Sequence, residues 1–140
     1  MKGANYVDTF IMVADDSRVT TGTQPLVKSD NVSIVARQFA MISERPYAHT
    51  SEDVIFDVHA DRAGISGEDR PKARQEYFSK GRPCLRASDL AKKYGWGIHC
   101  DELGRVALYG VETPEYTEFV EQGLKDGSPT LIKAMRSARN

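Results

Sequence analysis

Two neighbouring segments, residues 96–100 and 105–111, constrain the fold of this chain most strongly because both are predicted strands. The four residues between them, Asp101-Glu102-Leu103-Gly104, end in a glycine, as is common in hairpin loops of three to five residues. The sequence therefore predicts a β-hairpin near the centre of the second half of the chain.

Two further segments have the two-residue period of a strand. Residues 6–13 are largely apolar on both faces, which predicts a central strand. Residues 54–61 also alternate, and we favour a half-buried strand there over the helix that Thr50 and Asp53 could start as a capping pair.

Helical spacing and capping residues predict four helices, at residues 31–44, 71–80, 88–94 and 113–123. Ser29, Asp30 or Asn31 could cap the first of them. Glycines suit the ends of the last two, Gly95 and Gly123. The segment 131–139 fits a terminal helix or a last strand, and we favour the helix.

The order of these elements predicts an α+β fold. Strands and helices are mixed without strict alternation, which favours a small antiparallel or mixed sheet of about four strands with helices packed on it. A chain of 140 residues is close to the usual size of one domain, so we expect residues 1–140 to form a single globular domain.

Composition excludes several classes of protein. With 40% hydrophobic and 28% charged residues, the chain has no stretch near the roughly 18 apolar residues of a membrane span. The apolar run 10–14 is shorter than the core of a secretion signal and is flanked by aspartates. We therefore expect a soluble cytoplasmic protein whose two cysteines are reduced thiols.

Charge is unevenly distributed although its net value is only −1. Residues 70–93 hold eight basic and two acidic side chains, a local balance of +6. Residues 44–69 and 101–126 each hold seven acidic and two basic ones, a balance of −5. A pI near 6.3 argues against a nucleic-acid-binding domain, for which a pI above about 9 is more typical. The basic segment instead predicts a site for a small anion or an anionic group of a partner.

The residues expected to bind that anion lie between Ser79 and Trp96. Fixed positive charge, a permissive glycine and a helix N-terminus are the ingredients of a phosphate or carboxylate site, although the P-loop pattern is absent. Tyr94 and Trp96 could form an aromatic wall beside it. The predicted ligand-binding residues are Lys80, Arg82, Arg86, Ser88, Tyr94 and Trp96. The alternatives are a solvated basic loop and a tryptophan that packs in the core.

A catalytic alternative centres on Cys84, which lies between Arg82 and Arg86. Nearby guanidinium groups stabilise a thiolate and so could make it a nucleophile. His99 could serve as its base, with Asp101 or Asp57 as the accompanying carboxylate. The alternative is an inert, packed cysteine, since free cysteine is among the most buried residue types.

A metal site is a weaker possibility, at Asp57-x-His59-x-Asp61. On a strand these three side chains would share one face and offer a nitrogen and two carboxylates. A solvated strand face has the same pattern, and no second histidine stands at a zinc-protease spacing. We therefore expect no metal and no cofactor.

Several short motifs resemble a family of small, mostly bacterial proteins known only as a domain of unknown function. They are Asp8-Thr9-Phe10-Ile11, Pro46-Tyr47 with Thr50-Ser51-Glu52-Asp53-Val54, Phe78-Ser79-Lys80-Gly81 with Pro83-Cys84-Leu85-Arg86-Ala87-Ser88, Lys93-Tyr94-Gly95-Trp96-Gly97-Ile98-His99, Val106-Ala107-Leu108-Tyr109 and Lys133-Ala134-Met135-Arg136-Ser137. The resemblance spans nearly the whole chain. It implies one domain, and no activity, substrate or cofactor.

Three functions follow from these observations. The preferred one is a small cytosolic binding module for an anionic small molecule or partner group. An enzyme that uses Cys84 and His99 with a nearby carboxylate is the first alternative. A protein–protein interaction domain, which would expose an apolar patch of several hundred Å², is the second.

Overall fold

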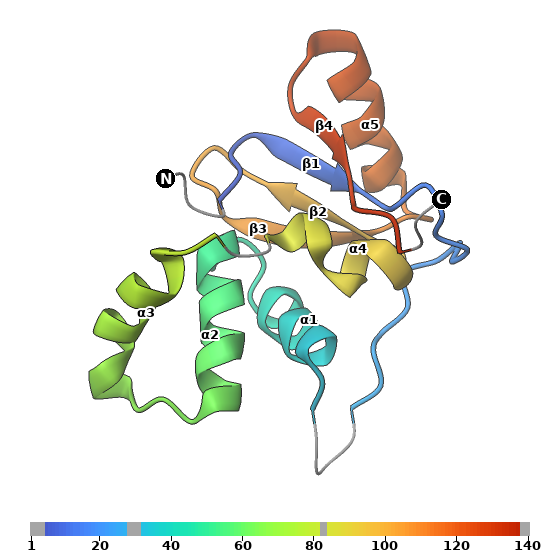
Figure 1. Cartoon of the computed structure of the whole chain (residues 1–140). Coiled ribbons are helices and arrows are strands. Elements are labelled where there is room, and N and C mark those ends of the chain that lie inside the picture. The colour runs from blue at the N-terminus through green and yellow to red at the C-terminus, as the bar shows by residue number, and fades with distance from the viewer. Residues whose placement is uncertain (1–4, 28–31, 82–83, 138–140) are drawn as a thin grey trace.

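Strand β1 (Thr9–Met12) lies at the centre of a four-stranded sheet whose order is β3-β2-β1-β4. It pairs antiparallel with β2 (Trp96–Cys100) and parallel with β4 (Thr130–Lys133). Strand β3 (Val106–Gly110) pairs antiparallel with β2, which confirms the predicted hairpin. This computed structural model describes residues 5–27, 32–81 and 84–137 (Figure 1).

The helices cover both faces of this mixed sheet, so the predicted single α+β domain is confirmed. Helix α5 (Pro114–Asp126) lies on one face, and α1 (Ile34–Glu44), α2 (Ser51–Ala63) and α4 (Asp89–Lys93) lie on the other, with α3 (Arg70–Phe78) beside α2 (Figure 1). Among the described residues no helix is long and apolar enough to cross a membrane.

The predicted helices are present, with small differences at their ends. Ser33 caps α1 by accepting a hydrogen bond from the Ala36 N–H, whereas the caps expected at residues 29–31 lie outside the described residues. Helix α5 continues through Gly123 and ends at Gly127, whose φ of 76° is the left-handed conformation that favours glycine.

The strand predicted at residues 54–61 is wrong, because this segment lies within helix α2. Thr50 and Asp53 form the capping box that the sequence offered, with both reciprocal hydrogen bonds made. The two-residue pattern arose because α2 packs against α1 and α3 and buries residues on more than one side: Val54, Ile55, Phe56, Val58 and Ala60. A helix buried on several sides loses the simple 3.6-residue pattern.

The terminal helix favoured for residues 131–139 is also wrong over the part that the structure describes, because β4 occupies Thr130–Lys133. A strand forms here because the backbone N–H and C=O groups on the otherwise free edge of β1 need hydrogen-bond partners. The Thr130 N–H donates to the Asp8 carbonyl at 2.8 Å, and the Ala134 N–H donates to the Met12 carbonyl at 2.8 Å.

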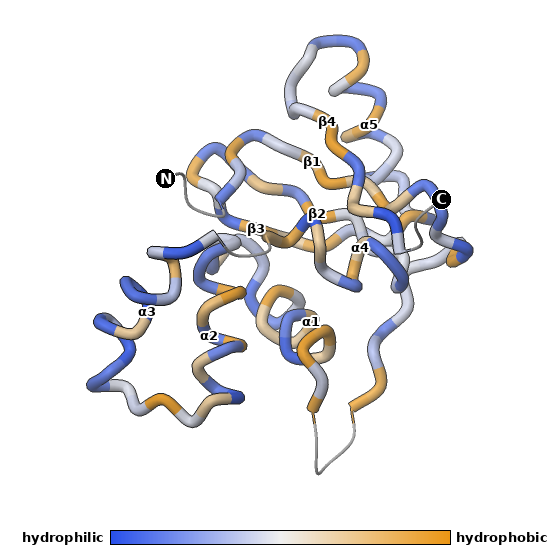
Figure 2. The backbone as a smooth tube through the Cα atoms, viewed as in Figure 1, coloured by the Kyte–Doolittle hydropathy of each residue, from blue (hydrophilic) through white to orange (hydrophobic). Residues whose placement is uncertain are grey.

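The core has two parts, separated by the sheet. On the α1 side, Ile11, Ile98 and Val106 pack with the apolar faces of α1, α2 and α4. On the α5 side, Phe10 stacks on Phe119 with ring centroids 4.9 Å apart. Apolar residues follow the strands and the inner helices, whereas α3 is largely hydrophilic (Figure 2).

We predict that Gly97→Ala is destabilising. A Cβ at this position would lie 2.6 Å from Phe10 Cζ and 2.6 Å from Tyr116 Cε2, so the α5 side of the core would have to shift. Overpacking of this kind costs about 1–3 kcal/mol of unfolding free energy, measurable by urea denaturation. Gly67→Ala is the control, because nothing lies within 4 Å of its Cβ. Equal stability of the two variants would contradict this packing.

Candidate functional site

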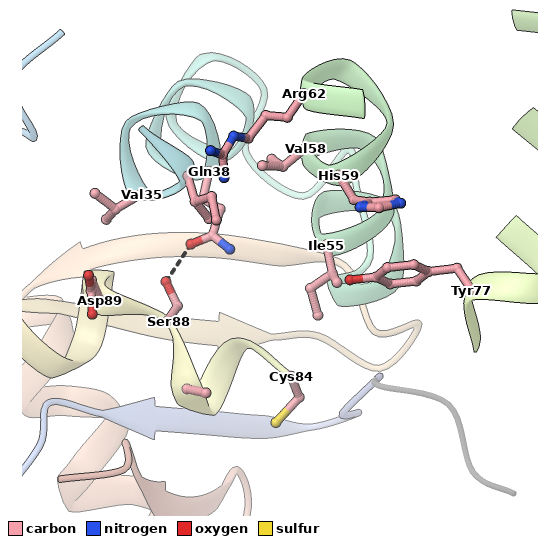
Figure 3. A pocket seen from close by; sticks show the side chains of 12 residues that line it. Val35, Gln38, Ile55, Val58, His59, Arg62, Tyr77, Cys84, Ser88 and Asp89 are labelled. Carbon is pink, nitrogen blue, oxygen red and sulfur yellow. Dashed lines mark hydrogen bonds between the residues drawn. The ribbon is translucent and has the colours of Figure 1, made fainter. Parts of the chain in front are cut away.

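A cavity of about 380 Å³ lies between helices α1 and α2 and the segment that leads into α4 (Figure 3). Its volume is within the range of small-molecule sites in proteins. The lining residues come from α1 (Ile34, Val35, Gln38), α2 (Ile55, Val58, His59, Arg62), α3 (Tyr77) and the segment before and at the start of α4 (Cys84, Ala87, Ser88, Asp89).

The walls of this cavity are mainly apolar. Val35, Ile55 and Val58 are buried and line the cavity, and Val58 lies between the two helices in Figure 3. Residues 55, 58, 59 and 62 share one face of α2 because they are three, four and seven residues apart. The helical conformation of α2 therefore creates this wall, which a strand could not have formed.

A hydrogen-bonded pair of polar side chains lies within the apolar wall. Gln38 and Ser88 are only 7% and 6% exposed, and Ser88 Oγ donates to Gln38 Oε1 at 2.5 Å. Ser88 Oγ also accepts from the Leu90 N–H at 3.1 Å, which caps α4. Gln38 Nε2 has no hydrogen bond within the described part of the chain, and it points into the cavity in Figure 3.

Arg62 extends from α2 over the cavity (Figure 3). It makes no ion pair or hydrogen bond with any described residue. By contrast, Arg70 binds Asp61 at 2.8 Å and Arg74 binds Asp53 at 2.8 Å. Arg62 is therefore a cation at the cavity whose charge the described residues do not neutralise.

Among the predicted anion-binding residues that the structure describes, only Ser88 lines the cavity. Its hydroxyl caps α4 and donates a hydrogen bond to Gln38. Arg86 Nε donates to the Lys133 carbonyl at 2.6 Å. Trp96 Nε1 donates to the Thr23 carbonyl at 2.9 Å. Tyr94 packs against the core and Lys80 is exposed beyond α3, whereas Arg82 lies outside the described residues.

The predicted catalytic residues lie apart. Cys84 lines the cavity, with its Sγ 3.0 Å from the Tyr6 hydroxyl. Burial and the hydrogen bond with Cys84 raise the pKa of Tyr6 to about 12, so Tyr6 stays protonated and is no base for the thiol. His99 is on the opposite face of the sheet, stacked on Phe119 at 4.2 Å. The carboxylate of Asp101 accepts from the Leu103 and Arg105 N–H groups in the hairpin turn.

His99 belongs instead to a chain of hydrogen bonds with two tyrosines. The Tyr47 hydroxyl lies 2.8 Å from His99 Nδ1 and 2.8 Å from the Tyr109 hydroxyl. Burial lowers the pKa of His99, so the neutral imidazole is favoured, and burial together with Tyr109 raises the pKa of Tyr47. Tyr47 has a φ of 60°, which is unusual for a bulky residue.

The predicted metal-binding residues do not share one face, because they lie on a helix. Asp57 and Asp61, four residues apart, both interact with Arg70, at 3.9 and 2.8 Å. His59 stacks on Tyr77 with ring centroids 4.5 Å apart. Over residues 5–27, 32–81 and 84–137, no group of three metal-ligating side chains is present.

Sequence reasoning missed Gln38 and Arg62 in the cavity and Tyr47 and Tyr109 beside His99. The Thr50–Asp53 capping pair was the available signal for Arg62, because a helix from Ser51 places residue 62 on the same face as residues 55 and 58. Gln38 had a similar signal, since it lies three residues after Val35 on the apolar face of α1. The tyrosines come from distant segments and had none.

We predict that Ser88→Ala is strongly destabilising. The change removes the α4 cap and leaves Gln38 Oε1 buried without its donor. Such losses typically cost about 1–3 kcal/mol of unfolding free energy. Ser43→Ala, at an exposed position of α1, is the control. Urea denaturation that gave the two variants the same stability would contradict the role of this pair.

The lowered pKa of His99 predicts a loss of stability in acid. Because unfolded His99 titrates near its ordinary value of 6.5 and folded His99 below it, the unfolded state binds more protons as the pH falls. The contribution of neutral His99 to the unfolding free energy is therefore complete above about pH 6.5 and declines below it. Denaturation at pH 7.5 and 5.5 should show a smaller decline for His99→Gln than for the parent chain. An equal decline would contradict a neutral, half-buried imidazole.

Comparison with known proteins places the chain in a family. No curated protein and no solved structure matched the chain significantly. A family model described as a family of unknown function (DUF6157) matches residues 1–140, the whole chain, which confirms the family resemblance seen in the sequence motifs. The bacterial origin of its members stays a prediction. The chain therefore belongs to the DUF6157 family of unknown function.

Proposed function

We propose that this protein binds a small anionic organic molecule in the cavity between α1 and α2. The observation that carries the proposal is the Arg62 guanidinium, which has no partner among the described residues and lies at a cavity with apolar walls. A guanidinium is the side chain best suited to a carboxylate or phosphate, because it can donate two parallel hydrogen bonds.

The cavity also favours a ligand with a substantial apolar part. Val35, Ile55 and Val58 offer hydrocarbon surface, and a volume of about 380 Å³ accommodates roughly 10 to 20 non-hydrogen atoms at ordinary packing density. Gln38 Nε2 supplies a second donor from within the wall. The proposed ligand therefore has an acidic group near Arg62 and an apolar body between the helices.

This proposal keeps the anionic ligand expected from the sequence and changes the residues that bind it. Arg62 replaces Arg86, whose Nε already donates to the Lys133 carbonyl. An anion site at Lys80, Arg82 and Arg86 stays a prediction. The enzyme alternative gains no support from the arrangement, because Cys84 and His99 lie on opposite faces of the sheet.

A screen of small carboxylates and phosphates by thermal shift tests the proposal. A ligand present at 100 times its Kd adds about 2.7 kcal/mol to the unfolding free energy, which raises Tm by several degrees. We predict that Arg62→Gln abolishes the shift, because the uncharged amide cannot replace the guanidinium. Arg18→Gln is the matched control, since Arg18 is also exposed, has no described partner and does not line the cavity.

A second variant tests the location independently of charge. Ala87→Leu adds a larger side chain to the cavity wall at a half-buried position and should also abolish the shift. Binding that survived both Arg62→Gln and Ala87→Leu would contradict a site in this cavity.

A further inference from the structure

The cavity carries a negative charge as well as a positive one. Asp89, the first residue of α4, is half-buried and lines the same cavity as Arg62. Its carboxylate makes no ion pair or hydrogen bond with the described residues, and the two charges do not pair with each other. They come from different elements, and the Gln38–Ser88 pair lies between them in Figure 3.

Asp89 restricts which anions the cavity can hold. Charges that face an apolar, partly desolvated cavity interact more strongly than charges in water. A ligand that placed negative charge at both ends would be repelled by Asp89, and a ligand with an apolar end there would desolvate the carboxylate without compensation. A ligand that placed a cationic hydrogen-bond donor beside Asp89 would satisfy it.

We propose that the natural ligand class is zwitterionic: an acidic group bound by Arg62, a protonated amine bound by Asp89, and an apolar spacer along Val35, Ile55 and Val58. This inference rests on the proposed function and narrows its ligand. The side chain of Gln38 donates from the wall between the two ends of the ligand.

Three matched series of compounds test the proposal: alkanoates, alkylamines and ω-amino alkanoates of four to eight carbons, with 3-phenylpropanoate and 3-[4-(aminomethyl)phenyl]propanoate as a more rigid pair. Binding is measured from NMR shifts of cavity residues in the full chain. We predict that the best amino carboxylate binds about tenfold more tightly than the carboxylate of equal length, as expected for one charge-assisted hydrogen bond.

Asp89→Asn gives the decisive comparison. It should remove the tenfold advantage of the amino group, while the affinity for the simple carboxylates stays the same or increases. Arg62→Gln should weaken both classes of carboxylate. Asp126→Asn is the matched control, because Asp126 is exposed at the end of α5 on the other face of the sheet.

The outcomes separate this inference from the function on which it rests. If carboxylates bind and depend on Arg62, but the amino group gives no advantage and Asp89→Asn has no effect, the zwitterionic ligand is wrong and anion binding stands. If no compound shifts the NMR signals of the cavity residues at millimolar concentration, or if Arg62→Gln leaves the affinity unchanged, both proposals are wrong.

Discussion

The central strand β1 has to be covered on both of its faces, and the rest of the molecule follows from that requirement. Phe10 and Ile11 are each fully buried, and adjacent strand residues point to opposite faces. Burying such side chains contributes about 1.5–3 kcal/mol each, so neither face can be left in water without a large loss. Helix α5 covers Phe10, and the helices on the other face cover Ile11.

The candidate site is a product of how the Ile11 face is covered. Helices α1 and α2 and the segment leading into α4 meet there, and the Ser88–Gln38 hydrogen bond joins two of them. A buried polar pair of this kind fixes a single arrangement, because each alternative leaves a donor or an acceptor unsatisfied. The inward-facing amide of Gln38 is thus positioned by the same Ser88 hydroxyl that caps α4.

Local signals in the sequence were sufficient where one short segment determines the structure. The hairpin loop that ends at Gly104 and the starts of the helices predicted at residues 88–94 and 113–123 depend on a few neighbouring residues, and each prediction was correct. The strand predicted within α2 was wrong because contacts on several sides of this helix determine which of its residues are apolar. The partners of β4 and of His99 are distant in sequence, and a single sequence gives no measure of such pairings.

Helix α3 is attached to the domain in a different way from the other long helices. None of its residues is buried, and it meets α2 through the ion pairs of Arg70 and Arg74 and through ring contacts of Tyr77. Exposed ion pairs contribute about 0.2–1 kcal/mol each and weaken as ionic strength rises. The amide hydrogens of α3 should therefore exchange with solvent through local opening, long before those of β1. Because Tyr77 forms part of the cavity wall, such an opening would widen the cavity while the core stays folded.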